Sequence, residues 1–173
     1  MHTKASKAWF AISNTVYQNK KLSITKALQL IDSLVTPIGL YACEFWTPYS
    51  IPIKNVNNSE PLLKFWENFL PETLNQRVCR MLLSVHKKSS RLAVLGEIAR
   101  YPLFLKALIQ TLKYDWYLRN KSSQSLVQSS FKEMDLLATQ GNSNWSSTID
   151  SIKKSLSIRK IHKTLPIKKL VNF

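Results

Sequence analysis

Apolar residues recur at helical spacing along most of the chain, and the clearest stretch runs from Leu28 to Trp46. From Leu28 to Ile38 an apolar residue returns every third or fourth position, which puts one apolar stripe on one side of a helix. Beyond Pro37 the stripe widens until little polar surface remains, and a helix that is apolar all round has to be surrounded by protein. The pattern predicts a central helix, or two helices joined at Pro37, because proline tolerates the first helical position.

Weaker periodic stretches on both sides predict further helices. One covers residues 3–19, Ser23 caps another that runs into the central element, and Pro71 and Pro102 each open a helix. No alternating strand pattern stands out, so we predict an all-α fold: an irregular helical bundle around a central apolar helix, with a basic C-terminal helical appendage. After the central element, helices are expected over residues 62–70, 72–85, 91–99, 102–119, 131–138 and 145–156. We expect the chain to divide into three parts: residues 1–50, residues 51–120, and residues 121–173, the last of which is a polar linker followed by a basic amphipathic tail.

The chain is strongly basic, with 25 Lys and Arg against 10 Asp and Glu, a formal net charge of +15 and a pI of about 10.0. Its 45% hydrophobic residues argue against a disordered basic tail. A folded protein of this charge attracts polyanions, of which nucleic acid is the commonest and an anionic membrane surface the weaker alternative. Glu44 and three prolines interrupt the most apolar stretch, so we expect no membrane span. No signal segment opens the sequence, and we expect an intracellular protein.

Two groups of basic residues are candidates for contact with phosphate. The first lies along a polar face of the first predicted helix and just beyond it, where simple solvation is the alternative. The second follows the helix that Pro71 opens, where cations would also stabilise a helix C-terminus through its dipole. The candidate nucleic-acid-binding residues are Lys4, Lys7, Lys20 and Lys21 in the first group, and Arg77, Arg80, Lys87, Lys88 and Arg91 in the second.

The helix expected after Pro102 carries both a core stripe and a polar face with an aromatic residue. Tyr117 shares that polar face with Lys106 and Lys113, and its ring can either stack on a base or simply cover its neighbours. Single aromatic residues at helical spacing are usually packing, which favours the second interpretation. The predicted core stripe consists of Leu105, Leu108, Ile109, Leu112 and Trp116.

No constellation typical of catalysis occurs in the sequence. The acidic residues are scattered, and the chain has no Gly-rich phosphate loop, no nucleophile elbow and no Cys–His set with zinc spacing. Gly96 inside a predicted helix indicates close packing rather than a phosphate cradle. Cys43 and Cys79 are expected to be reduced thiols in the core. We therefore expect no enzyme activity, no metal and no cofactor.

Three blocks in a fixed order resemble the C-terminal part of reverse transcriptases from non-LTR (LINE-like) retrotransposons, downstream of the catalytic palm. KASKAWFAI followed by IDSLVTPIGLYACEFW is similar to the thumb region. Arg77 to Val85 is similar to the family's "f-k-iL-gv" helix, and Ala93 to Leu103 to its "avlgELGr-Pl" segment. The resemblance covers roughly residues 4 to 118. The family-signature positions, which we assign to structure, are Pro37, Tyr41, Glu44, Trp46, Gly96, Glu97, Arg100 and Pro102.

Departures from the family pattern are also present. Ala42 and Ala99 stand where the family usually has glycine, and the palm with its paired aspartates has no counterpart in these residues. The resemblance implies a non-catalytic thumb and post-thumb portion of an RNA-directed DNA polymerase. Such a portion holds the backbone of the template-primer or of RNA without reading sequence, beside the polymerase palm, in a nuclear or cytoplasmic ribonucleoprotein. Glu44 and Glu97 are expected to form buried ion pairs with Arg or Lys.

Two other interpretations stay open on the sequence. One is a basic helical scaffold protein whose tail, residues 145–173, binds a partner or a membrane surface. The other is a degenerate retroelement fragment without a selected function. The oligomeric state is not predicted.

Overall fold

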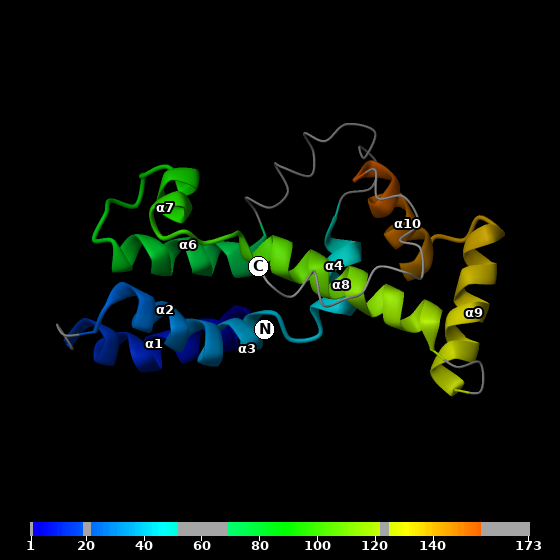
Figure 1. Ribbon diagram of the computed structural model, residues 1–173, viewed down its shortest axis with the longest axis horizontal. Helices are drawn as coiled ribbons and strands as arrows, with labels where there is room; N and C mark the ends of the chain where they lie inside the picture. The colour runs from blue at the N-terminus through cyan, green and yellow to red at the C-terminus, as the bar shows by residue number, and fades with distance from the viewer. Residues whose placement is uncertain (1, 19–21, 52–68, 122–124, 157–173) are drawn as a thin grey trace.

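The computed structural model describes residues 2–18, 22–51, 69–121 and 125–156, and these residues form helices and turns without a strand (Figure 1). The predicted all-α class is therefore confirmed. Lys20, Lys21, most of the helix expected over residues 62–70, and the basic residues beyond Leu156 lie outside the described residues. The helices are α1 (His2–Gln18), α2 (Ile24–Leu34), α3 (Thr36–Gly39), α4 (Cys43–Ser50), α6 (Leu70–Leu82), α7 (Arg91–Glu97), α8 (Leu103–Asn120), α9 (Leu126–Thr139) and α10 (Trp145–Ser155).

Several predicted helix starts are confirmed because their capping chemistry is local. The Ser23 hydroxyl accepts a hydrogen bond from the backbone N–H of Lys26 at 3.3 Å, and Pro71 lies in the first turn of α6. Pro102 immediately precedes α8. Helix α9 begins at Leu126, earlier than predicted, because Ser125 caps it by accepting from the N–H of Gln128.

The stretch from Leu28 to Trp46 is divided among three helices rather than forming one central element. Helix α2 ends at Leu34, the short α3 carries Pro37 in its first turn, and α4 starts only after Ala42, whose φ of +53° turns the chain. Tyr41 and Phe45 are more than half exposed, so this stretch is not surrounded by protein on every side. The restart at Thr36–Pro37 agrees with the two-helix alternative, but the second break was not predicted.

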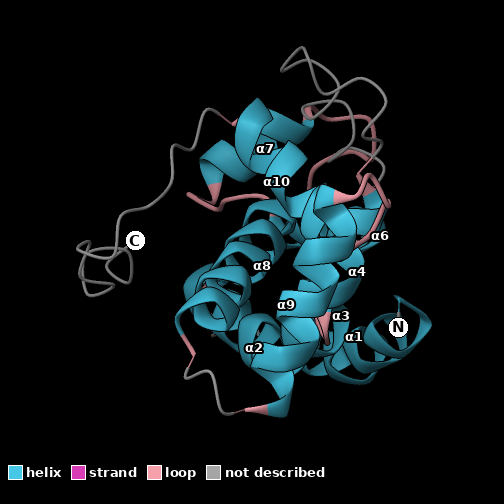
Figure 2. Cartoon of the chain, turned by 90° about the vertical axis from the view of Figure 1, so that its right-hand side faces the viewer, coloured by secondary structure: helices cyan, strands magenta, loops and turns pink. Residues whose placement is uncertain are grey.

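Helix α8 occupies the central position instead, and it packs against α4, α6 and α9 (Figure 2). Its predicted core stripe is rotated by about one position, because Leu105 and Ile109 are exposed. Both sides of this helix are rich in apolar residues, and the side that is buried also carries two polar residues, Thr111 and Asp115. The buried residues of α8 are Leu103, Phe104, Ala107, Leu108, Thr111, Asp115 and Leu118.

The C-terminal helix is part of the core rather than an appendage. Ile149 and Ile152 of α10 are fully buried, and the indole N–H of Trp145 donates to the backbone oxygen of Glu44 at 2.9 Å. The largest apolar cluster joins residues of α4, α6, α7, α8 and α10, so it draws on all three predicted parts of the chain. The division into those parts stays a prediction. None of the described helices is both long and apolar enough to cross a bilayer.

Candidate nucleic-acid interface

Helices α1 and α6 present basic residues on a shared outer surface. Their inner faces pack through an apolar cluster that includes Ala5, Trp9 and Val78. On the outer side, the guanidinium carbon of Arg77 lies 5.6 Å from the ring centroid of Phe10, which is 55% exposed. Lys4, Lys7 and Phe10 follow one another at three-residue spacing along α1 and therefore share a face. We call Lys4, Lys7, Phe10 and Arg77 the α1–α6 basic surface.

Arg80 does not belong to that surface, although the sequence places it with Arg77. Its side chain is half-buried, and Nη2 donates to the backbone oxygen of Ser89 at 3.0 Å. This bond ties α6 to the turn that leads into α7. Arg80 is therefore explained by a structural role.

Lys87 and Lys88 are exposed in the turn between α6 and α7. Because α6 ends at Leu82, both lysines lie beyond its last turn, where the helix dipole has fallen off. Their proposed role in stabilising the helix C-terminus is thus not supported by the geometry. Arg91 is the half-buried first residue of α7.

Two signature positions, Trp46 and Arg100, contact distant parts of the fold. The Trp46 ring stacks on Phe69 at 5.5 Å, and its indole N–H donates to the backbone oxygen of Tyr41 at 2.9 Å. The guanidinium of Arg100 is almost buried and pairs with both carboxylate oxygens of Asp32, at 2.6 and 3.3 Å. This pair fastens the segment before α8 to α2.

Three predictions about the other signature positions are wrong. Gly96 is exposed, and a Cβ added there would meet nothing within 4 Å, so it is not a point of close packing. Glu97 is exposed and Glu44 is half-buried, and within the described part of the chain neither forms an ion pair. By contrast, Pro37 lies in the first turn of α3, where a helix start was predicted, and it is exposed.

Among the described residues, three other than glycine have a left-handed backbone: Ala42 (φ +53°), Ser84 (φ +54°) and Ala99 (φ +52°). Ser84 and Ala99 end α6 and α7 in the same way as Gly141 ends α9. In each case the next N–H donates to the carbonyl five residues back, at 2.9 to 3.1 Å. Glycine is the usual residue at this position of a helix end, because a Cβ is strained there. Two of these three helix ends therefore carry a side chain where glycine is favoured.

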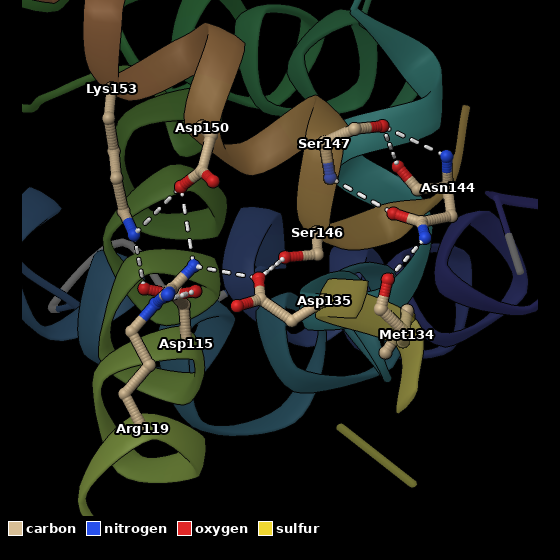
Figure 3. Close-up of polar contacts among 9 residues, drawn as sticks. All are labelled: Asp115, Arg119, Met134, Asp135, Asn144, Ser146, Ser147, Asp150 and Lys153. Atoms are coloured by element: carbon tan, nitrogen blue, oxygen red, sulfur yellow. Dashed lines mark hydrogen bonds and ion pairs between the residues drawn. The ribbon is translucent and has the colours of Figure 1, made fainter. Parts of the chain in front are cut away.

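A network of charged side chains fixes α8, α9 and α10 together (Figure 3). Asp115 is 3% exposed and accepts from Arg119 Nε at 3.0 Å and from Lys153 Nζ at 2.5 Å. Arg119 and Lys153 also reach Asp150, and the Ser146 hydroxyl donates to Asp135 at 2.7 Å. This network was not predicted from the sequence, although the spacing from Asp115 to Arg119 is a helical ion-pair signal.

Glu72 is a second buried acid that was missed. It is fully buried, and its carboxyl group accepts from the backbone N–H of Leu103 at 2.5 Å and from the side-chain amides of Asn75 and Gln76. The contact with Leu103 satisfies one of the free N–H groups at the start of α8. Its partner lies 31 residues away, so no local pattern predicts it.

These contacts bury or pair much of the negative charge of the described residues. The carboxyl groups of Asp32, Asp115, Asp135 and Asp150 contact cations, and Glu72 is buried. By contrast, the lysines of the α1–α6 basic surface are exposed and have no ion pair within the described residues. Within the described part of the chain, most of the unpaired charges at the surface are therefore positive.

Both cysteines are free thiols in the core, as predicted. Burial raises the pKa of the Cys43 thiol to about 12 and that of the Cys79 thiol to about 11. Such thiols are protonated and unreactive at neutral pH. In the part of the chain that the structure describes, no group of His, Cys, Asp and Glu residues could hold a metal ion.

Comparison with known proteins identifies no relative. No protein-family model, no curated protein and no solved structure matches the chain.

Proposed function

We propose that this chain is a thumb and post-thumb portion of an RNA-directed DNA polymerase of the non-LTR retrotransposon type. It grips the sugar-phosphate backbone of a template-primer duplex or of RNA through the α1–α6 basic surface and the exposed Lys87 and Lys88. It carries out no catalysis itself. Phosphate contacts of this kind hold and orient nucleic acid without reading its sequence.

The main observation behind the proposal is that the left-handed residues coincide with glycine positions of the family pattern. The family pattern has glycine at Ala42 and at Ala99, and both have positive φ. When the nine positions of "f-k-iL-gv" are aligned with Arg77 to Val85, the glycine of the pattern falls on Ser84, the third left-handed residue. A pattern of unrelated origin has no reason to place glycine at these three left-handed positions of the described residues.

The charge distribution supports the same proposal independently. Five of the acidic residues are engaged or buried inside the protein, whereas Lys4, Lys7 and Arg77 are exposed on adjacent helices. A surface that exposes clustered cations suits a polyanion.

The test is binding of a short RNA–DNA hybrid duplex, measured by fluorescence anisotropy from about 50 to 200 mM salt. The logarithm of affinity is expected to fall linearly with the logarithm of salt concentration, since each phosphate contact releases counterions. In the variant Lys4→Gln, Lys7→Gln, Arg77→Gln, the slope is expected to become shallower by about one per lost contact.

The matched control removes three positive charges from other helices, with Lys26→Gln, Lys132→Gln and Lys154→Gln. These three lysines are also exposed. The control variant is expected to bind more tightly than the first variant, with a slope near that of the wild type. An affinity that does not change with salt would refute the proposal, and equal effects of the two variants would reduce it to attraction by net charge.

A further inference from the structure

An exposed row of aromatic rings lies where α4 crosses α8, away from the residues assigned to phosphate contact. Phe45 meets Tyr114 edge to face at 5.2 Å, and Tyr114 stacks with Tyr117 at 6.3 Å and 25°. Phe45 is 54% exposed and Tyr117 is 46% exposed. The half-buried Tyr114 between them also packs edge-on against the buried Trp145, which holds the row against the core.

Two lysines flank this row. Lys113 is exposed one helical turn before Tyr117, and Lys121 follows one turn after it. Lys121 Nζ lies 2.5 Å from the Tyr117 hydroxyl and 4.9 Å from the ring centroid, so it sits at the hydroxyl edge rather than above the ring. The ring face is therefore not covered by this ammonium group.

Two carboxylates adjoin this row in sequence. Asp115 adjoins Tyr114 in sequence, but it is buried in the network with Arg119 and Lys153. Glu44, the single carboxylate of α4, is half-buried. The row thus combines flat apolar faces with positive charge.

We propose that Phe45, Tyr114 and Tyr117, with Lys113 and Lys121, form an aromatic platform that binds single-stranded nucleic acid by stacking its bases. Every base has a π-face, so stacking tolerates any sequence, and lysines beside the rings attract the neighbouring phosphates. In a duplex the base faces are occupied by one another, which makes an unpaired strand the ligand that fits. The proposal rests on the proposed function only in that the ligand is again nucleic acid, since the residues are different.

The experiment compares two labelled strands of ~12 nucleotides, oligouridylate and an abasic sugar-phosphate strand of equal length. The wild type is expected to bind oligouridylate at least about fivefold more tightly than the abasic strand, because only the former can stack. Phe45→Leu and Tyr117→Leu keep an apolar side chain but remove the flat ring, so each is expected to lose about fivefold or more for oligouridylate and nothing for the abasic strand.

Tyr101→Leu is the matched control, because Tyr101 is 66% exposed and lies before α8. It is expected to leave both affinities unchanged. The unaltered protein gives a second measurement: photo-crosslinking to 5-iodouridine within the strand, followed by mass spectrometry, is expected to mark Phe45 or Tyr117. This readout does not depend on whether a variant folds.

Equal affinity of the wild type for the two strands, or crosslinks confined to other helices, would overturn the platform. In that case both strands would still be expected to bind in a salt-dependent way, and the proposed phosphate contacts of the α1–α6 basic surface would not be contradicted. Conversely, the phosphate-contact proposal fails if the Lys4→Gln, Lys7→Gln, Arg77→Gln variant binds both strands as tightly as its matched control, while the preference for oligouridylate is unchanged. The two proposals therefore fail in different ways.

Discussion

Replacing Ala99 with glycine is expected to stabilise the protein, which reverses the usual effect of this substitution. The backbone of Ala99 has φ +52° at the end of α7. A left-handed conformation costs an L-residue about 1–2 kcal/mol, and glycine does not incur that cost. Against this, glycine gives the unfolded chain more freedom, worth about 0.4–1 kcal/mol. Ala99 is exposed, so its methyl group contributes little burial. The net gain is expected to be about 0.5–1 kcal/mol.

The matched control is Ala11→Gly, in the middle of α1. Ala11 is exposed too, but it lies in an ordinary helix, where glycine is less stable than alanine by about 1 kcal/mol. Thermal and urea unfolding followed by circular dichroism measure both variants. For a chain of this size, 1 kcal/mol shifts the midpoint of thermal unfolding by about 2–4 °C, which is readily resolved.

The two variants are expected to move in opposite directions. Destabilisation of Ala99→Gly by as much as Ala11→Gly would refute a left-handed backbone at this position. Because the family pattern has glycine there, that result would also remove the main support for the retrotransposon proposal. Ala42→Gly is expected to gain less, since the half-buried methyl group of Ala42 is lost as well.

Three further predictions concern the buried polar groups. Glu72→Leu leaves the N–H of Leu103 and two side-chain amides without an acceptor, so urea unfolding should show a loss of about 3 kcal/mol or more. Asp115→Asn removes the charge of the most buried acid in the α8–α10 network and should lower the free energy of unfolding by about 2–4 kcal/mol. The loss lies at the lower end of this range if solvent screens the partly exposed cations. The raised pKa values of Cys43 and Cys79 contribute stability that is complete below pH 9 and is lost as the pH rises towards 11 and 12. Between pH 8 and pH 10 this loss is about 2–3 kcal/mol and should be absent from the Cys43→Ala, Cys79→Ala variant.

The sequence predicts well those features that depend on neighbouring residues. Ser23 and Pro102 mark helix starts because a cap or a fixed φ acts within one turn. The α8 face was placed wrongly because Leu105 and Ile109 match a helical stripe as well as the residues that are buried. The burial of Thr111 was not predicted from the pattern. Its hydroxyl donates to the carbonyl of Ala107, which lets a polar residue lie in the core.

The spacing of apolar and polar residues does not predict contacts between distant segments. The bond from Glu72 to the start of α8 joins residues that no periodicity relates. The sequence alone favours packing for Tyr117, because it does not show which other aromatic residues lie beside its ring. The fold places Phe45 of α4 beside Tyr114, and only that arrangement makes a surface large enough to stack bases. Helical faces can be predicted from spacing, whereas the neighbour that covers or extends a face cannot.

Arg77 and Arg80 show this limit within a single turn of α6, and they give the last prediction. The spacing of three puts both on one helical face, yet Arg77 is exposed beside Phe10 while Arg80 donates to the backbone of Ser89. Arg80→Ala is expected to lower the free energy of unfolding by about 1.5–3 kcal/mol, the range for a hydrogen bond from a charged group. Arg77→Ala is expected to change the free energy of unfolding by no more than about 0.5 kcal/mol, because only its exposed contact with Phe10 is lost. The same variant is expected to bind duplex more weakly, with a shallower dependence of affinity on salt. Unfolding and anisotropy measured on the same two variants separate the roles. If Arg80→Ala lowers affinity at full stability, the Ser89 contact is not its function, and both arginines face the nucleic acid.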